Sequence, residues 1–139
     1  MRTAIVIATG LVALTAGAVA HADQKADQKF CAAAAEYRSD IAELNAIGPH
    51  STVAELRAAT DRLDKPVKDM QKAADKMKTP TAKHFTESMK QLKEHVNSIP
   101  DDATLEQART KIRVDIQNAE NSGRQVATEA GCPPPAPQP

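Results

Sequence analysis

Two cysteines, one near each end of the folded region, are the feature that most constrains this chain. Cys31 and Cys132 lie 101 positions apart and are the only cysteines present. If the fold is a stack of antiparallel helices, only an even number of helices returns the chain to its starting end. Three helices would leave the sulfurs tens of ångströms apart, at about 1.5 Å per helical residue. We therefore expect a Cys31–Cys132 disulfide, the alternatives being two free thiols or pairing between molecules.

Residues 1–22 are predicted to be a signal peptide. Arg2 supplies a positive start, an uncharged apolar stretch follows, and the small residues of Ala20-His21-Ala22 suit a signal peptidase. A retained membrane anchor is the alternative, because the uncharged run approaches the roughly 20 residues needed to span a bilayer. We expect cleavage after Ala22, no stable membrane insertion afterwards, and a secreted protein or one residing in the periplasmic or cell-envelope space.

Apolar residues then recur at intervals of three and four, which is the period of an amphipathic helix. Glycine and proline interrupt this pattern three times, at positions 48–49, 80 and 100, leaving four helical stretches. These stretches run from Phe30 to Leu44, Val53 to Met77, Ala82 to Ile99 and Leu105 to Ala130. We predict an all-α, up-down-up-down four-helix bundle with one disulfide over residues 23–132, followed by a disordered Pro-rich tail at 133–139.

Side chains at the expected helix ends support these boundaries. Capping boxes are predicted at two helix starts, a threonine before proline at a third, and a C′ glycine after the last helix. The residues are Thr52 with Glu55, Thr104 with Gln107, Thr79 before Pro80, and Gly131. Pro66 falls inside the second stretch, where the apolar pattern continues unbroken. It predicts a kink, with a new helix capped by Asp64 as the alternative.

The composition argues against several kinds of function. The chain has 18 basic and 18 acidic side chains, and this neutral balance argues against nucleic acid as a partner. After removal of the leader only Gly48, Gly123 and Gly131 remain, so no glycine-rich phosphate loop is present. If both cysteines are bonded there is no thiolate nucleophile, and no serine lies in a nucleophile-elbow sequence. We therefore predict that the protein is not an enzyme.

The histidines are candidate ligands for a metal or haem. His84 and His95 share one side of a helix but lie about 16 Å apart along its axis, too far to bind one ion together. No second set of carboxylates accompanies them, and no Cys-x-x-Cys-His haem attachment sequence occurs. We predict no cofactor and no metal site. A carrier that uses Tyr37 or His84 as a single haem ligand is the alternative.

A lysine-rich face on the second helix would suit an anionic wall polymer or lipid headgroups. Its residues are Lys65, Lys68, Lys72 and Lys76. Asp61 and Asp64 precede the first two lysines by four positions, the spacing of helical ion pairs, which favours an ordinary solvated face.

Four short segments stand out in the sequence: Cys31-Ala32, Thr52 to Arg57, Pro100 to Leu105, and Gly131-Cys132-Pro133. In these segments the chain resembles the small secreted helical-bundle proteins of actinobacteria that carry one disulfide between their N- and C-terminal regions. That family has no established activity, so the resemblance implies architecture alone. Together these features predict a secreted, non-enzymatic helical interaction module whose partner is a protein or cell-wall component. A small-ligand carrier, for haem or metal, is the alternative function.

Overall fold

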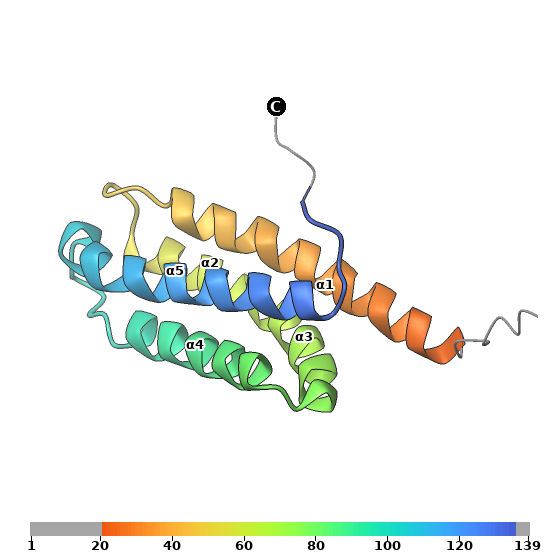
Figure 1. Cartoon of the computed structure of the whole chain (residues 1–139). Coiled ribbons are helices and arrows are strands. Elements are labelled where there is room, and N and C mark those ends of the chain that lie inside the picture. Colours follow the sequence, from red (N-terminus) through yellow and green to blue (C-terminus); the bar gives the residue numbers. More distant parts are fainter. Residues whose placement is uncertain (1–20, 136–139) are drawn as a thin grey trace, which may run out of the picture.

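The computed structural model describes residues 21–135, and the surroundings of side chains from residue 28 onward. Most of the predicted signal peptide and the last four residues of the Pro-rich tail lie outside the described residues. The described part is all-α (Figure 1). Its helices are α1 (His21–Ala46), α2 (Val53–Arg62), α3 (Asp64–Met77), α4 (Pro80–Asn97) and α5 (Leu105–Glu129). None of these helices is both long enough and apolar enough to cross a membrane.

The helices form the predicted up-down-up-down bundle, in which α2 and α3 together make the second helix. Each helix packs against the next along the chain, and α5 returns beside α1 to close the bundle. The loop after α1 and the loop after α4 lie at one end, on the left of Figure 1. The α3–α4 loop and the C-terminal end of α5 lie at the other. An even number of helical passes therefore brings the two ends of the chain together.

The second helix is kinked, as the proline predicted. Leu63 separates α2 from α3 but keeps helical backbone angles, φ −67° and ψ −19°, so the two helices meet at this one residue and no loop lies between them. Pro66 has no N–H to donate to the carbonyl of Arg62, which weakens the helix at this point. The alternative of a new helix capped by Asp64 is wrong, because α3 has no side-chain cap hydrogen bond.

Local chemistry sets most of the other helix ends. The backbone N–H of Glu55 donates to Oγ1 of Thr52 and the Glu55 carboxylate accepts from the Thr52 N–H, which completes the predicted capping box. Thr79 likewise accepts a hydrogen bond from the N–H of Ala82, with Pro80 in the first turn. The predicted box at Thr104 does not form: the residue has extended backbone angles but makes no side-chain cap bond.

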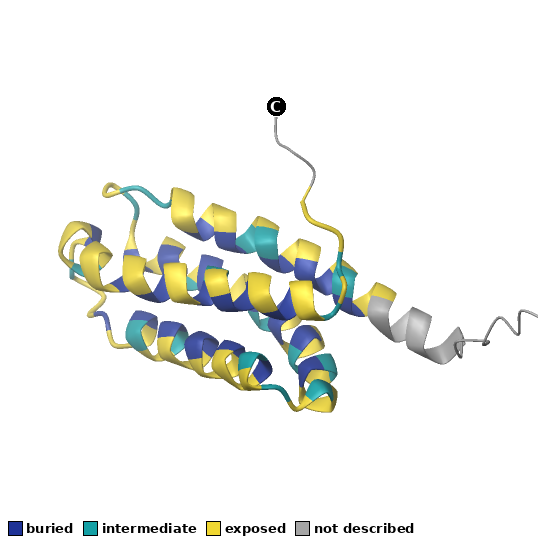
Figure 2. Ribbon diagram, in the orientation of Figure 1, coloured by how far each residue is buried: buried dark blue, intermediate teal, exposed yellow. Residues whose placement is uncertain are grey.

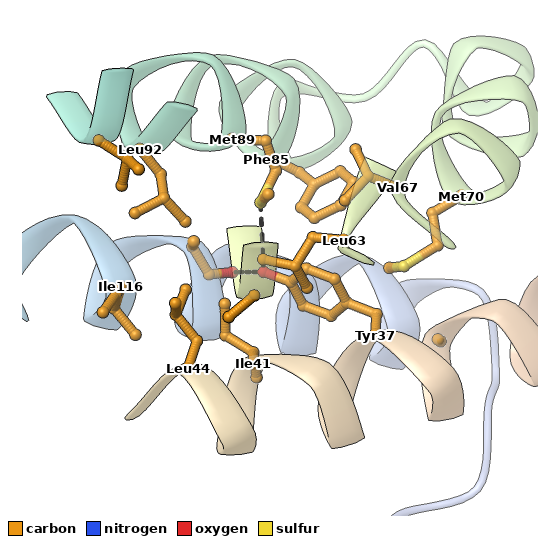
Figure 3. Close-up of a cluster of buried hydrophobic side chains, with 14 of the residues drawn as sticks. Tyr37, Ile41, Leu44, Leu63, Val67, Met70, Phe85, Met89, Leu92 and Ile116 are labelled. Atoms are coloured by element: carbon orange, nitrogen blue, oxygen red, sulfur yellow. Dashed lines mark hydrogen bonds between the residues drawn. The ribbon is translucent and has the colours of Figure 1, made fainter. Parts of the chain in front are cut away.

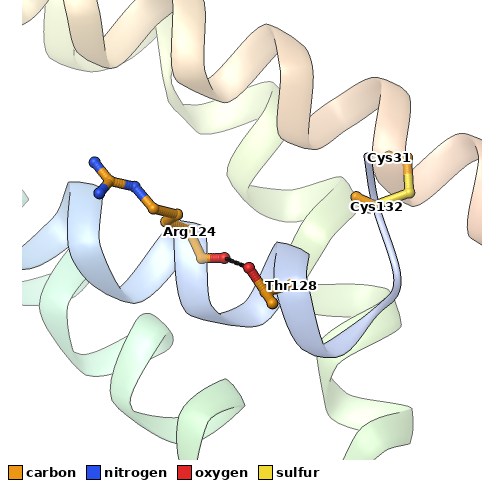
Figure 4. Close-up of a disulfide and its surroundings, with 4 residues drawn as sticks. All are labelled: Cys31, Arg124, Thr128 and Cys132. Carbon is orange, nitrogen blue, oxygen red and sulfur yellow. Dashed lines mark hydrogen bonds between the residues drawn. A yellow bond between two sulfur atoms is a disulfide. The ribbon is translucent and has the colours of Figure 1, made fainter. Parts of the chain in front are cut away.

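A reversal at the end of α5 directs the chain back to α1. Gly131 has a positive φ of 74°, as expected for a C′ residue, and its N–H donates to the carbonyl of Thr128. The N–H of Cys132 donates to the carbonyl of Ala127, which completes a Schellman motif. This reversal brings Cys132 to α1, where it forms the predicted disulfide with Cys31, at a Cα–Cα distance of 5.3 Å (Figure 4).

The core lies along the bundle axis, where each helix turns its buried stripe inward (Figure 2). Two aromatic rings lie at its centre, shown in Figure 3. Tyr37 of α1 and Phe85 of α4 meet edge to face with ring centroids 5.5 Å apart, and both are almost completely buried. Aliphatic residues such as Leu44, Leu63 and Leu92 fill the space around them, so the middle of the bundle is solidly packed.

Candidate functional site

An apolar pocket lies at the end of the bundle away from the disulfide. It has a volume of about 70 Å³ and is bounded by the end of α1, the following loop, α2 and the first half of α5. Leu44 of α1 and Ile116 of α5, which lie next to one another in Figure 3, form part of its wall. The other apolar lining residues are Ile47, Leu56, Leu105 and Ile112, and the polar ones are Asn45, Arg109 and Arg113.

The pocket stays uncovered because of the sequence that ends α1. The helix stops at Ala46 and the chain continues through Ile47 and Gly48 to Pro49, which cannot extend a helix. Gly48 contributes no side chain, and a β-carbon built there would meet no atom within 4 Å. The inward stripes of α1, α2 and α5 therefore approach one another here without a residue to close the gap.

Two arginines give the pocket a positive edge. Arg109 and Arg113 are four residues apart on α5, which places them one turn and about 6 Å apart along the helix axis. Both are exposed, and neither forms an ion pair with any residue between 28 and 135. The guanidinium groups are thus free to bind a carboxylate from outside the described structure.

Glu106, three residues before Arg109 on α5, forms no ion pair within the described residues, and two further acidic residues are engaged elsewhere. Glu120, two turns further along α5, accepts hydrogen bonds from Asn45 at 3.3 Å and from Arg124 at 2.7 Å. Asp101, in the loop before α5, pairs with Arg57. The positive charge at the pocket is therefore not neutralised by either of these carboxylates.

A second groove, of about 200 Å³, runs between α3 and α4 beside Lys68 of the lysine-rich face. It is edged by Lys68, Lys90 and Lys93. Lys93 donates to both oxygens of Asp64 at 2.7 Å, and Lys90 lies 3.7 Å from Glu94. Most of its positive charge is matched by carboxylates of this chain, so this groove is less suited to an anionic ligand than the α5 pocket.

The helical ion pairs predicted for the lysine-rich face are wrong. Lys65 binds Glu36 of α1 at 3.0 Å, and this hydrogen-bonded carboxylate raises the pKa of Lys65. Asp64 binds Lys93 of α4, as described above. On the facing side of α1, partial burial raises the pKa of Asp40, and the neighbouring charges of Glu36 and Glu43 raise it further. Lys65 and Asp64 therefore each pair with the helix packed against them, whereas Lys72 lies 3.8 Å from Asp69 of α3 itself.

Tyr37, one of the two alternative haem ligands, is part of the core. Its hydroxyl donates to the carbonyl of Ala119 at 2.6 Å and lies 3.5 Å from the sulfur of Met89. Burial, and secondarily the charge of Glu120, raise the pKa of Tyr37 well above its usual range. The phenol oxygen is therefore enclosed, neutral and already hydrogen bonded, and a ligand would have to open the bundle to reach it.

The two helix-borne histidines have different surroundings. His84 is exposed on α4, whereas Nδ1 of His95 lies 2.5 Å from a carboxylate oxygen of Asp115 on α5. The Asp115 side chain is only 9% exposed, so this pair joins α4 to α5 at a partly buried position. Within the described range, no group of three or more histidine, cysteine or acidic side chains is placed to hold a metal ion.

The sequence placed most apolar residues of the pocket on helix stripes but did not single out its two arginines. Arg109 and Arg113 flank the apolar stripe of α5 at a helical spacing of four, and this pattern was visible in the sequence. Whether these arginines are neutralised depends on which acidic residues lie opposite them, and that depends on how the helices pack.

No family model, no curated protein and no solved structure matches this chain.

Proposed function

We propose that this protein is an exported, non-enzymatic interaction module that binds a partner protein through the pocket beside Arg109 and Arg113. The observation that carries the proposal is the combination of an open apolar pocket with two arginines that have no acidic partner in the described structure. Interfaces typically place an apolar side chain in such a pocket and surround it with charged groups.

The size of the pocket supports a protein partner over a carried cofactor. An apolar cavity of about 150 Å³ holds one benzene molecule. The volume here is about 70 Å³, which suits a single aliphatic side chain and is far too small for a haem. A polysaccharide, the other partner considered, has no aliphatic side chains with which to fill an apolar pocket.

Export is supported by the disulfide and by the predicted leader. Disulfides such as Cys31–Cys132 persist mainly in proteins that leave the reducing cytosol. The disulfide also stabilises the folded bundle without a cofactor, because it lowers the conformational entropy of the unfolded chain. Both features suit a recognition surface that works outside the cell.

The proposal is tested by selecting ligands without assuming their sequence. A displayed library of random twelve-residue peptides is selected on the oxidised protein, and selected peptides are titrated into isotope-labelled protein. We expect the methyl signals of Leu44, Ile47 and Ile112 to shift, while those of Met70 near the other end do not. Gly48→Phe, which adds a large side chain beside the pocket, should weaken binding, whereas the matched control Gly48→Ala should not.

Two results would contradict this function. One is that selected peptides leave the pocket signals unchanged and bind Gly48→Phe as well as the original protein. The other is that haem or zinc binds stoichiometrically at micromolar concentration, with signal changes that map to His84 or His50, since this would favour the ligand-carrier alternative.

A further inference from the structure

The chemistry of the pocket also restricts the segment that would occupy it, if the proposed function is correct. We infer that the partner presents an aliphatic residue together with aspartate or glutamate about one helical turn away. The aliphatic side chain enters the pocket and the carboxylates pair with Arg109 and Arg113. This inference rests on the proposed function and adds the identity of the partner's side chains.

The apolar part follows from the pocket wall. Leu44, Leu56 and Ile112 are each less than 5% exposed, so the base of the pocket is formed from buried aliphatic side chains. A polar side chain entering it would lose its hydrogen bonds to water without gaining new ones. A long acyl chain does not fit, because the volume of about 70 Å³ accommodates only a few methylene groups.

The acidic part follows from the pattern of ion pairs. Arg57, Arg62 and Arg124 each bind a carboxylate of this chain, with Asp101, Glu43 and Glu120 respectively. Arg109 and Arg113, on the same side of α5 as the pocket, have no such partner among residues 28–135. Arginine binds carboxylates through two parallel hydrogen bonds, so the uncommitted pair favours an acidic segment over a neutral or basic one.

The helical spacing of the arginines restricts the arrangement of the acids. Because Arg109 and Arg113 lie one turn apart, two carboxylates one turn apart on a partner helix would match them. Such pairs at the edge of an interface act mainly on specificity and association rate, while the buried aliphatic residue supplies most of the affinity. The affinity of an acidic partner should therefore decrease as salt is raised.

The test uses the full oxidised protein and four sets of synthetic twelve-residue peptides. In each peptide one residue is leucine or alanine, and the residues three and seven positions after it, which lie one helical turn apart, are either glutamate or lysine. Binding is measured by fluorescence anisotropy at low and high salt. We expect the leucine–glutamate set to bind best, and Arg109→Ala/Arg113→Ala to weaken its binding roughly tenfold or more and to remove the salt dependence.

Lys111→Ala is the matched control, because it removes an exposed positive charge from α5 at a residue that does not line the pocket. It should leave the affinity within about twofold. Comparable binding of the leucine–lysine set at the pocket would overturn the acidic requirement while leaving the proposed function intact. Vesicles containing anionic lipid form a separate arm: arginine-dependent vesicle binding without peptide binding would overturn both statements.

Discussion

Gly123 of α5 lies directly against the ring of Tyr37 of α1. A β-carbon at position 123 would lie 3.0 Å from Cζ and 3.2 Å from Cδ1 of that ring, and closer still to Cε1. The backbone of Gly123 is helical, so the glycine is required by this contact and not by its own conformation. The absence of a side chain lets α5 approach α1 closely enough for the Tyr37 hydroxyl to reach the Ala119 carbonyl.

Gly123→Ala should therefore destabilise the fold, although alanine is the better helix former. The added methyl would force the rigid Tyr37 ring to move in a packed core, at a cost of about 1 to 3 kcal/mol. Urea unfolding followed by circular dichroism measures this. Gly48→Ala is the control, because a β-carbon there meets nothing within 4 Å. Equal stability of the two variants would show that the contact is not tight.

Tyr37→Phe should cost about 1 kcal/mol at neutral pH, because one buried hydrogen bond is lost. The difference should shrink in alkali. The pKa of Tyr37 is raised in the folded state, so above the usual value of about 10 the unfolded chain releases this proton first and the native protein loses stability as pH rises.

The alkaline prediction has a direct optical readout, because Tyr37 is the only tyrosine. The absorbance of the ionised phenol should rise together with the loss of helix by circular dichroism. Ionisation at pH 10 in protein that is still folded would show that the hydroxyl is not enclosed.

His95→Ala should be more destabilising than His84→Ala. Removing His95 leaves the Asp115 carboxylate, only 9% exposed, without its partner, at a cost of about 1 to 3 kcal/mol. His84 is exposed, and its replacement should change the free energy of unfolding by less than about 0.5 kcal/mol. In His95→Ala/Asp115→Ala part of the loss should be recovered. A cycle with no coupling energy would show that the pair contributes nothing.

Reduction of the disulfide should lower the free energy of unfolding by several kcal/mol. Cys31–Cys132 closes a loop of 101 positions, for which the chain-entropy model gives about 4 to 5 kcal/mol. Urea midpoints with and without a phosphine reductant measure the effect. Cys31→Ala/Cys132→Ala should match the reduced protein and be insensitive to reductant. A loss below about 1 kcal/mol would mean that helix packing alone keeps the termini together.

The features that could be predicted from the sequence depend on neighbours three or four residues away. The four apolar stripes, the caps at Thr52 and Thr79, the C′ glycine at 131 and the kink before Pro66 all involve such short separations. The disulfide added one long-range condition, which agrees with the even number of helices that the apolar pattern predicts. The predicted capping box at Thr104 was wrong: the backbone has the angles of an N-cap residue, but the side chain makes no hydrogen bond to the helix.

The charged contacts could not be predicted in the same way. Asp61 with Lys65 and Asp64 with Lys68 have the spacing of helical pairs, yet Lys65 binds Glu36 and Asp64 binds Lys93. Leu63 lies between Asp61 and Lys65, so the kink disturbs the spacing of the first pair, whereas Asp64 and Lys68 both lie within α3. A facing helix also offered Lys65 the carboxylate of Glu36 and Asp64 the ammonium group of Lys93.

The amino-acid sequence by itself determined the number of helices, most of their ends and the covalent bond that joins the first to the last. The tertiary structure alone decided that Tyr37 is enclosed against Gly123, that His95 meets Asp115, and that Arg109 and Arg113 have no described acidic partner beside an open pocket. The reason is physical: helical period and capping act over one turn, whereas contacts between helices depend on how far each is rotated and how closely they approach.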